Sequence, residues 1–308
     1  MERFDILKLG LILLALLLMI NLLVRQYSTS NDIKSEGFKQ KEKFLLKKGN
    51  DVYDTFYAPI YQVIMEDPKK INYELNEIAS ISNIDKHSVV LDVGCGVGGH
   101  LIHLKHSIPK CKCVGLDQSK AMIKYAQREE YKYLKKRDIE WVHGDILDNY
   151  QFEPETFTHI FALQFSLYCI ENKSRFFENC YEFLQKDGTL IIHLVNKYKF
   201  DPIVNPANPL WMISPQKYYK ERMTKSHVKF DDMTYKSSFD MKDNNTCEFN
   251  ETMIDERSQH IRKNKHILYM MPQKQILNLA SECGFSILGK VDLKHCGYEY
   301  QYIYILRK

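Results

Sequence analysis

The sequence has little net charge, no Cys-x-x-Cys pair and no recognisable set of metal ligands. Its 308 residues include 43 basic and 39 acidic side chains, a net charge of only +4, and the basic residues are spread along the chain. This distribution offers no basic stripe for a nucleic-acid groove, so we expect no nucleic-acid partner. The eight cysteines lie in apolar, strand-like or helical stretches, which favours reduced thiols over a disulfide framework. Cys111 and Cys113, with the nearby histidines, match no zinc-ligand spacing, and we expect no metal.

The longest apolar run lies near the N-terminus. Residues 9–24 form a run of sixteen mostly apolar residues, slightly below the roughly 17–25 that a spanning helix needs, and Lys8 can snorkel to let the two residues before it extend the run. A cleaved signal peptide is the alternative, but Arg25-Gln-Tyr27 offers no small-x-small cleavage site. More basic residues follow the run than precede it. We therefore expect a single-pass membrane anchor at residues 1–24, with the catalytic portion of the chain facing the cytosol.

The rest of the chain divides into a linker and one folded domain. Residues 25–50 are polar and Lys-rich, which predicts a flexible linker that either lies against anionic lipid or is simply solvated. Within residues 51–308, strand-like runs alternate with helical ones from Asp85 onward, and this predicts a Rossmann-like, doubly wound α/β sheet. The expected strands are Ser88–Val93, Lys112–Asp117, Ile139–His143, His159–Leu163 and Thr189–Asn196. The expected helices between them are Gly98–His106, Ser119–Lys135 and Lys173–Leu184.

Two features depart from plain βαβ repetition. Phe285–Leu293 and Tyr298–Leu306 are strand-like and are joined by only about four residues, so the last strand must be antiparallel in an otherwise mostly parallel sheet. Before them, an insertion at about 197–271 contains the alternating runs Met233–Met241 and Cys247–Met253, which predict an antiparallel β-meander. We expect the meander either to form a substrate platform at the carboxyl ends of the main strands or to be packing without a functional role.

The glycine-rich stretch Asp92-Val-Gly-Cys-Gly-Val-Gly-Gly99 follows one predicted strand and opens a helix. Its glycines allow a sharp turn and a close approach to a ligand, and three of them also fit the spacing of a dinucleotide site. Asp92 separates the two alternatives, because a carboxylate disfavours a pyrophosphate but suits the cationic groups of S-adenosylmethionine. Asp117 ends the next strand, where it can accept hydrogen bonds from both ribose hydroxyls. Asp145 and Ile146 end the strand after that, placed to meet the adenine edge.

These three motifs at consecutive strand ends resemble the class I S-adenosylmethionine-dependent methyltransferases, over about residues 85–196 and the C-terminal hairpin. The resemblance implies methyl transfer, S-adenosylmethionine as cofactor, and a specific set of cofactor-binding residues. It assigns the methionine end and the backbone approach to Asp92, Gly94, Cys95, Gly96 and Gly98, the ribose to Asp117 and Gln118, and the adenine to Met122, Asp145 and Ile146. Cys95 occupies a small-residue position and is not expected to act as a nucleophile. The acidic residues are also compatible with ordinary helix-cap or turn roles.

The catalytic residues are less well defined. Tyr57 belongs to an aromatic set at helical spacing that either closes the site or packs in the core. A general base is needed only if the acceptor must lose a proton, and the candidates near the ends of the fourth and fifth strands are Gln164, Tyr168, His193 and Asn196. His193 has a suitable ordinary pKa, although a histidine inside an apolar strand is also compatible with simple packing.

The acceptor is not identified by any motif. No Asn/Asp-Pro-Pro-Tyr run follows the fourth strand, which argues against planar nucleobase or glutamine amides. The apolar N-terminal run favours a lipid or a membrane-associated small molecule. The alternatives are an NAD(P)-dependent oxidoreductase and a non-catalytic, membrane-tethered scaffold that binds the cofactor. The sequence does not predict the oligomeric state.

Overall fold

The computed structural model describes residues 14–16, 19, 42–207, 216 and 221–308. Most of the predicted anchor at residues 1–24 therefore lies outside the described residues, as does most of the predicted linker. Within the described ranges, no helix has both the length and the apolar character that a membrane span requires. The linker predicted for residues 25–50 extends too far, because Phe44–Lys48 forms strand β1 and Gly49–Val52 forms a 3-10 turn, η1.

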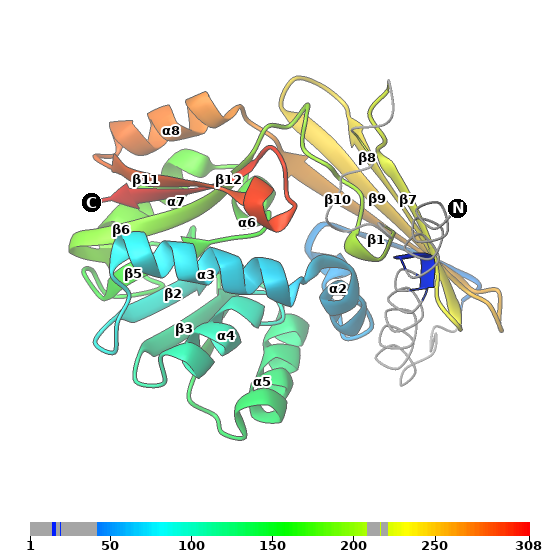
Figure 1. Cartoon of the computed structure of the whole chain (residues 1–308), viewed down its shortest axis with the longest axis horizontal. Coiled ribbons are helices and arrows are strands. Elements are labelled where there is room, and N and C mark those ends of the chain that lie inside the picture. The colour runs from blue at the N-terminus through cyan, green and yellow to red at the C-terminus, as the bar shows by residue number, and fades with distance from the viewer. Residues whose placement is uncertain (1–13, 17–18, 20–41, 208–215, 217–220) are drawn as a thin grey trace, which may run out of the picture.

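A seven-stranded sheet forms the main body of the domain (Figure 1). Its strands run in the order β11-β12-β6-β5-β2-β3-β4, and β2 to β6 are parallel. β12 is inserted between β6 and β11 and is antiparallel to both, so the predicted doubly wound sheet with a reversed final strand is confirmed. The strands are β2 (Val89–Val93), β3 (Lys112–Asp117), β4 (Glu140–His143), β5 (Phe157–Ala162), β6 (Leu184–Val195), β11 (Ser286–Asp292) and β12 (Gln301–Arg307).

Helices cover both faces of this sheet. The adjacent residues Val90 and Leu91 of β2 point to opposite faces and belong to two separate hydrophobic clusters, as expected for a strand buried on both sides. One cluster includes α3 and α4, and the other includes α7 and α8. The helices are α2 (Tyr57–Met65), α3 (Pro68–Ser82), α4 (Gly99–Ser107), α5 (Lys120–Leu134), α6 (Ser166–Cys169), α7 (Lys173–Phe183) and α8 (Gln273–Glu282).

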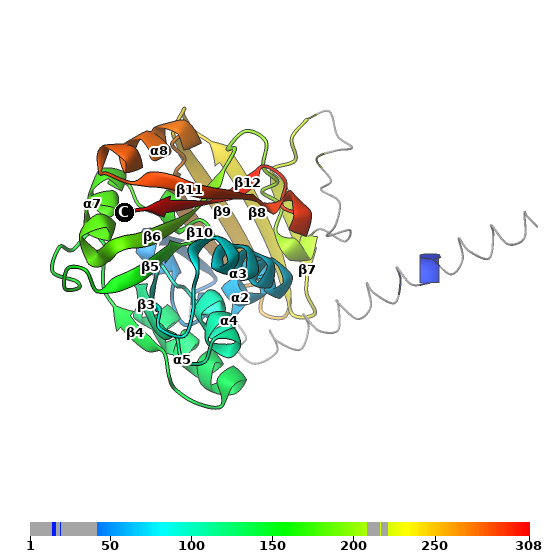
Figure 2. The ribbon, with the colours of Figure 1, turned by 60° about the vertical axis from the view of Figure 1, so that its left-hand side comes forward.

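A second sheet of five strands stands beside the first, and we call it the platform sheet (Figures 1 and 2). Its order is β1-β10-β9-β8-β7, in which β7 to β10 form an antiparallel meander and β1 pairs in parallel with β10. The predicted meander covered only two of these strands. The meander strands are β7 (Lys225–Lys229), β8 (Met233–Met241), β9 (Thr246–Asp255) and β10 (Ile261–Tyr269).

Candidate functional site

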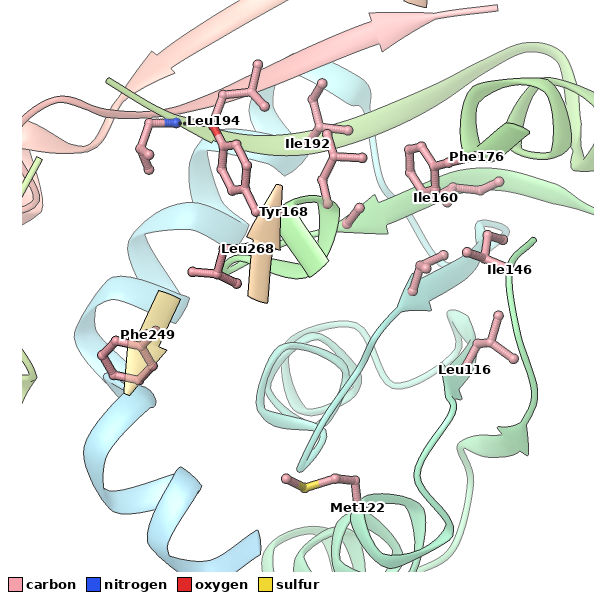
Figure 3. Packing of buried hydrophobic residues seen from close by; sticks show 14 of the residues in the cluster. Leu116, Met122, Ile146, Ile160, Tyr168, Phe176, Ile192, Leu194, Phe249 and Leu268 are labelled. Atoms are coloured by element: carbon pink, nitrogen blue, oxygen red, sulfur yellow. Dashed lines mark hydrogen bonds between the residues drawn. The ribbon is translucent and has the colours of Figure 1, made fainter. Parts of the chain in front are cut away.

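A cavity of about 270 Å³ lies where the carboxyl ends of the parallel strands face the platform sheet. Its walls come from two halves of the chain. Figure 3 shows Leu116, Met122 and Ile146 on one side, with Phe249 and Leu268 of the platform sheet on the other. The cavity is therefore open to the glycine-rich loop and to the meander at the same time.

The loop after β2 is shaped by glycines with positive φ. Gly94, Gly96 and Gly98 have φ of +66°, +54° and +87°, which only glycine adopts without strain. Gly94 and Gly96 line the cavity. At Gly98 an added Cβ would lie 2.4 Å from the indole of Trp141, so close packing also excludes a side chain there. The sequence thus builds a loop whose backbone can touch a ligand.

Asp117 lies at the end of β3, on the wall of the cavity. Its Oδ2 accepts the Gly96 N–H at 2.8 Å and its Oδ1 accepts the Ser119 N–H at 2.8 Å, which ties the glycine loop to the start of α5. Each carboxylate oxygen has further lone-pair capacity, so both can still accept a ribose hydroxyl. Burial raises the pKa of Asp117 above its ordinary value. Gln118 is exposed beside it and also lines the cavity.

Only two of the three residues predicted to contact adenine line the cavity. Met122 and Ile146 are buried and line the cavity, and Ser119 Oγ caps α5 by accepting the Met122 N–H at 3.1 Å. Asp145 instead accepts the Leu147 N–H at 2.9 Å in a turn, and its neighbour Gly144 lines the cavity in its place. The adenine contact of Asp145 stays a prediction.

Asp92 and Cys95 lie behind the loop rather than on the cavity wall. Asp92 is only 3% exposed, and burial raises its pKa to about 7, with the negative charge of Asp117 adding to the effect. Cys95 is also buried, and burial raises the pKa of its thiol well above the ordinary value. A protonated, buried thiol is a poor nucleophile.

Of the five catalytic candidates, three do not line the cavity, namely Asn196, His193 and Tyr168. His193 is fully buried in β6, its Nδ1 contacts the Gln164 carbonyl, its Nε2 contacts Gln301 Oε1 at 3.0 Å, and burial lowers its pKa to about 4. The Tyr168 hydroxyl is buried and accepts the Val195 N–H at 2.9 Å. His193 and Tyr168 therefore act in packing.

The other two candidates, Gln164 and Tyr57, do line the cavity. Gln164 Oε1 accepts a hydrogen bond from Lys70 Nζ at 3.3 Å, while its buried Nε2 has no partner within the described part of the chain. The Tyr57 ring is fully buried, and its hydroxyl donates to Glu251 Oε1 at 2.8 Å.

The structure adds two polar residues that the sequence patterns did not single out. Glu251 of β9 is buried beneath the cavity, and His266 of β10 lines it; the two side chains contact at 2.7 Å. No hydrophobic pattern in the sequence indicates them, because every second residue of β10 from Arg262 to Leu268 is buried although three of these four are polar. Buried polar residues on one face of a strand need partners, and here they form a network.

Comparison with known proteins supports the cofactor half of this site. A family model described as a methyltransferase domain matches residues 90–188. The sterol 24-C-methyltransferase of Candida albicans is 33% identical over 87 residues, which cover 28% of this chain and 23% of that protein. The chain therefore matches only about a quarter of the length of this relative.

Solved structures share the fold over most of the domain. An S-adenosylmethionine-dependent methyltransferase from Clostridium acetobutylicum has a TM-score of 0.61 at 17% identity, covering 82% of this chain and 97% of that one. The amino pentose methyltransferase CalS10 of Micromonospora echinaspora, solved with S-adenosylmethionine bound, has a TM-score of 0.54 at 16% identity, covering 79% and 92%.

Gly94 and Gly98 leave no room for a side chain, Gly96 has a positive φ, and Asp117 retains acceptor capacity toward the cavity. The residues present therefore fit S-adenosylmethionine. The predicted resemblance is confirmed by the matching family model and by the strand order with its reversed last strand. Residues 90–188 of this chain therefore match a methyltransferase domain, and the surrounding fold is that of solved S-adenosylmethionine-dependent methyltransferases.

Proposed function

We propose that this protein transfers the methyl group of S-adenosylmethionine to a small, largely apolar acceptor held against the platform sheet. The observation that carries the proposal is the single cavity whose walls include both the cofactor loop and the apolar side chains of the insertion. Methyl transfer is an in-line displacement, so a common space for acceptor and cofactor is its first structural requirement.

The acceptor side of the cavity is formed by packed aromatic and aliphatic side chains. Phe200 packs edge-on against Phe239, with ring centroids 5.1 Å apart, and Phe165 lies 5.5 Å from Phe200. Phe249 and Leu268 continue this surface on the platform sheet (Figure 3). Such a wall favours an apolar ligand and keeps a fixed shape because its rings support one another.

Each half of the cavity contributes a different part of the reaction. Bound S-adenosylmethionine supplies a methyl group already activated by its sulfonium. Gly94 and Gly96 allow the cofactor to approach the backbone, and Asp117 orients its ribose. The aromatic wall places the acceptor and excludes water, and Tyr57 closes the cavity from α2. Most of the rate in such a reaction comes from this alignment.

We further propose a lipid or membrane-associated acceptor. The support is the apolar wall together with the apolar run at residues 9–24, which predicts a membrane anchor with the catalytic domain on the cytosolic side. The Candida albicans relative is named for a sterol, which is an apolar acceptor, although its match covers a minor part of this chain.

The test is label transfer by the full-length protein reconstituted in lipid vesicles, with S-adenosylmethionine labelled on its methyl group. We expect label in the lipid extract. Label only in water-soluble small molecules or RNA would contradict the lipid acceptor, and no S-adenosylhomocysteine from any acceptor would contradict methyl transfer itself.

A matched pair of variants tests the acceptor wall. Leu268→Ala enlarges the cavity on the acceptor side, whereas Ile267→Ala alters the adjacent residue, which is 46% exposed. We expect Leu268→Ala to lower transfer at unchanged S-adenosylhomocysteine affinity and Ile267→Ala to change neither. Equal effects of the two variants would contradict this placement of the acceptor.

A further inference from the structure

A buried carboxylate lies under the acceptor side of the cavity. Glu251 is 1% exposed and receives four hydrogen bonds. The Tyr57 and Tyr235 hydroxyls each donate to Oε1 at 2.8 Å, while Asn264 Nδ2 at 3.1 Å and His266 Nε2 at 2.7 Å contact Oε2. Hydrogen bonds donated to a carboxylate favour its charged form, and all four partners of Glu251 are able to donate. The carboxylate is therefore ionised.

This carboxylate fixes the tautomer of His266. An ionised carboxylate can only accept, so the neutral form of the imidazole carries its proton on Nε2 and keeps a lone pair on Nδ1. Nδ1 lies 3.3 Å from the Tyr53 hydroxyl, and both His266 and Tyr53 line the cavity. The structure thus presents a basic nitrogen, oriented from behind by a buried anion, at the wall of the acceptor space.

Tyr53 links this nitrogen to the cofactor side. Its backbone carbonyl accepts a hydrogen bond from the Ser119 hydroxyl, and Ser119 also donates its N–H to Asp117. The Tyr53 ring lies 6.5 Å from that of Tyr61, which is the side chain nearest to the open face of Gly96. The base and the predicted ribose ligand are therefore held by one short stretch of chain on neighbouring walls of the same cavity.

We propose that His266 is the general base of this methyltransferase, that Glu251 positions it, and that the acceptor atom is the oxygen of a hydroxyl group. This rests on the proposed function, whose acceptor it defines. The acceptor O–H donates to Nδ1 at the place that the Tyr53 hydroxyl occupies in the structure. As the O–CH₃ bond forms and the S–CH₃ bond breaks, the bonding pair stays on sulfur. The hydroxyl proton moves to Nδ1, and Glu251 stabilises the imidazolium through Nε2–H.

The chemistry of the base selects the acceptor atom. A neutral amine already has a free lone pair, and an alkene carbon has no proton to lose before the methyl group arrives, so neither needs a base at this step. A hydroxyl becomes a strong nucleophile only as its proton leaves. The titratable groups facing His266 are Glu251 from β9, Tyr53 after η1 and Tyr57 from α2. Only Glu251 among them is an anion at neutral pH.

The probe for this proposal is 4-nitrophenol, whose phenolate absorbs visible light and whose neutral form does not. It is titrated into the full-length protein saturated with S-adenosylhomocysteine, slightly below the pKa of the free phenol. We expect the bound phenol to be ionised about tenfold more than the free phenol, because its proton passes to an imidazole paired with a carboxylate. His266→Gln can still donate to Glu251 but is not basic, and it should abolish the gain. Glu251→Gln should weaken the gain.

The control is His227→Gln on β7, an exposed histidine of the same platform sheet, which should retain the full gain. Thermal unfolding and S-adenosylhomocysteine affinity identify any variant that fails to fold. A wild-type protein that binds S-adenosylhomocysteine but gives no ionisation gain, or does not bind the phenol, would overturn the proposal, as would a gain retained by folded His266→Gln. Absence of S-adenosylhomocysteine binding by the wild type would instead contradict the proposed function.

Discussion

Replacing Asp117 by alanine should greatly reduce cofactor affinity with little change in the fold. The carboxylate joins Gly96 and Ser119 at 2.8 Å each and faces the cavity, where both ribose hydroxyls are expected to donate to it. A hydrogen bond to a charged acceptor contributes about 1.5–3 kcal/mol, so two of them correspond to about 3–6 kcal/mol. Since each 1.4 kcal/mol is about tenfold in affinity, the Kd for S-adenosylhomocysteine should rise at least about 100-fold.

Isothermal titration calorimetry with S-adenosylhomocysteine measures this change directly. Asp148→Ala is the matched control, because Asp148 is an exposed turn carboxylate that accepts the Tyr150 N–H at 3.0 Å and does not line the cavity. The control should bind like the wild type. A folded Asp117→Ala protein whose Kd lies within about threefold of wild type would refute the assignment of the ribose site, since that is less than the contribution of one such bond.

Three further predictions concern stability, measured by urea unfolding. Gly98→Ala should lower the free energy of unfolding by about 2–5 kcal/mol, because Gly98 has a positive φ and an added Cβ would clash with the indole of Trp141. Gly49→Ala, which also has a positive φ but open space around it, should lower it by only about 1–2 kcal/mol. Similar losses in the two variants would contradict the packing at Gly98. Burial raises the pKa of Asp92 from 3.8 to about 7, so stability present at low pH is lost as the pH rises through 7. The free energy of unfolding of Asp92→Asn, relative to that of the wild type, should therefore rise by about 2–3 kcal/mol as the pH increases from about 5 to about 8. A difference that does not change with pH would contradict the raised pKa of Asp92. Arg262→Met should lower the free energy of unfolding by about 3 kcal/mol, because Arg262 is buried and paired with Asp54. Arg257→Met should lower it by under about 0.5 kcal/mol, because Arg257 is exposed. Equal losses would contradict the difference between the buried and the exposed ion pair.

The main sheet could be predicted from the sequence because its signals are local. Each parallel strand is a short apolar run followed by a turn and a helix, and Ser119 and the glycine loop mark where helices begin. The last hairpin was predictable because a connection of a few residues cannot cross over a sheet. The strands β8 and β9 were predictable because their apolar and polar side chains alternate with a period of two.

The rest of the platform sheet depends on contacts between distant parts of the chain. β1 lies in a Lys-rich stretch that resembles a linker, and it becomes a strand by pairing with β10, more than 200 residues away. β10 buries Arg262, Asn264 and His266, so its inner face does not look apolar. A hydrophobic pattern cannot indicate a strand whose buried face is polar and satisfied by a network.

The candidate site was likewise predictable only where its signals are local in the sequence. Backbone conformation and strand-end position identified Gly94, Gly96 and Asp117, which line the cavity. The orientation of individual side chains was not predictable, and His193 is directed into the packing between β6 and the loop after β5. The pair formed by His266 and Glu251 arises from the register of β9 and β10, which the sequence does not specify residue by residue.

The most direct test of this account is a calorimetric titration of the purified full-length protein with S-adenosylhomocysteine and, separately, with NADH. We expect saturable one-to-one binding of S-adenosylhomocysteine and no binding of NADH. Binding of NADH without binding of S-adenosylhomocysteine would contradict the cofactor assignment and, with it, both the methyl transfer and the acceptor site built upon it.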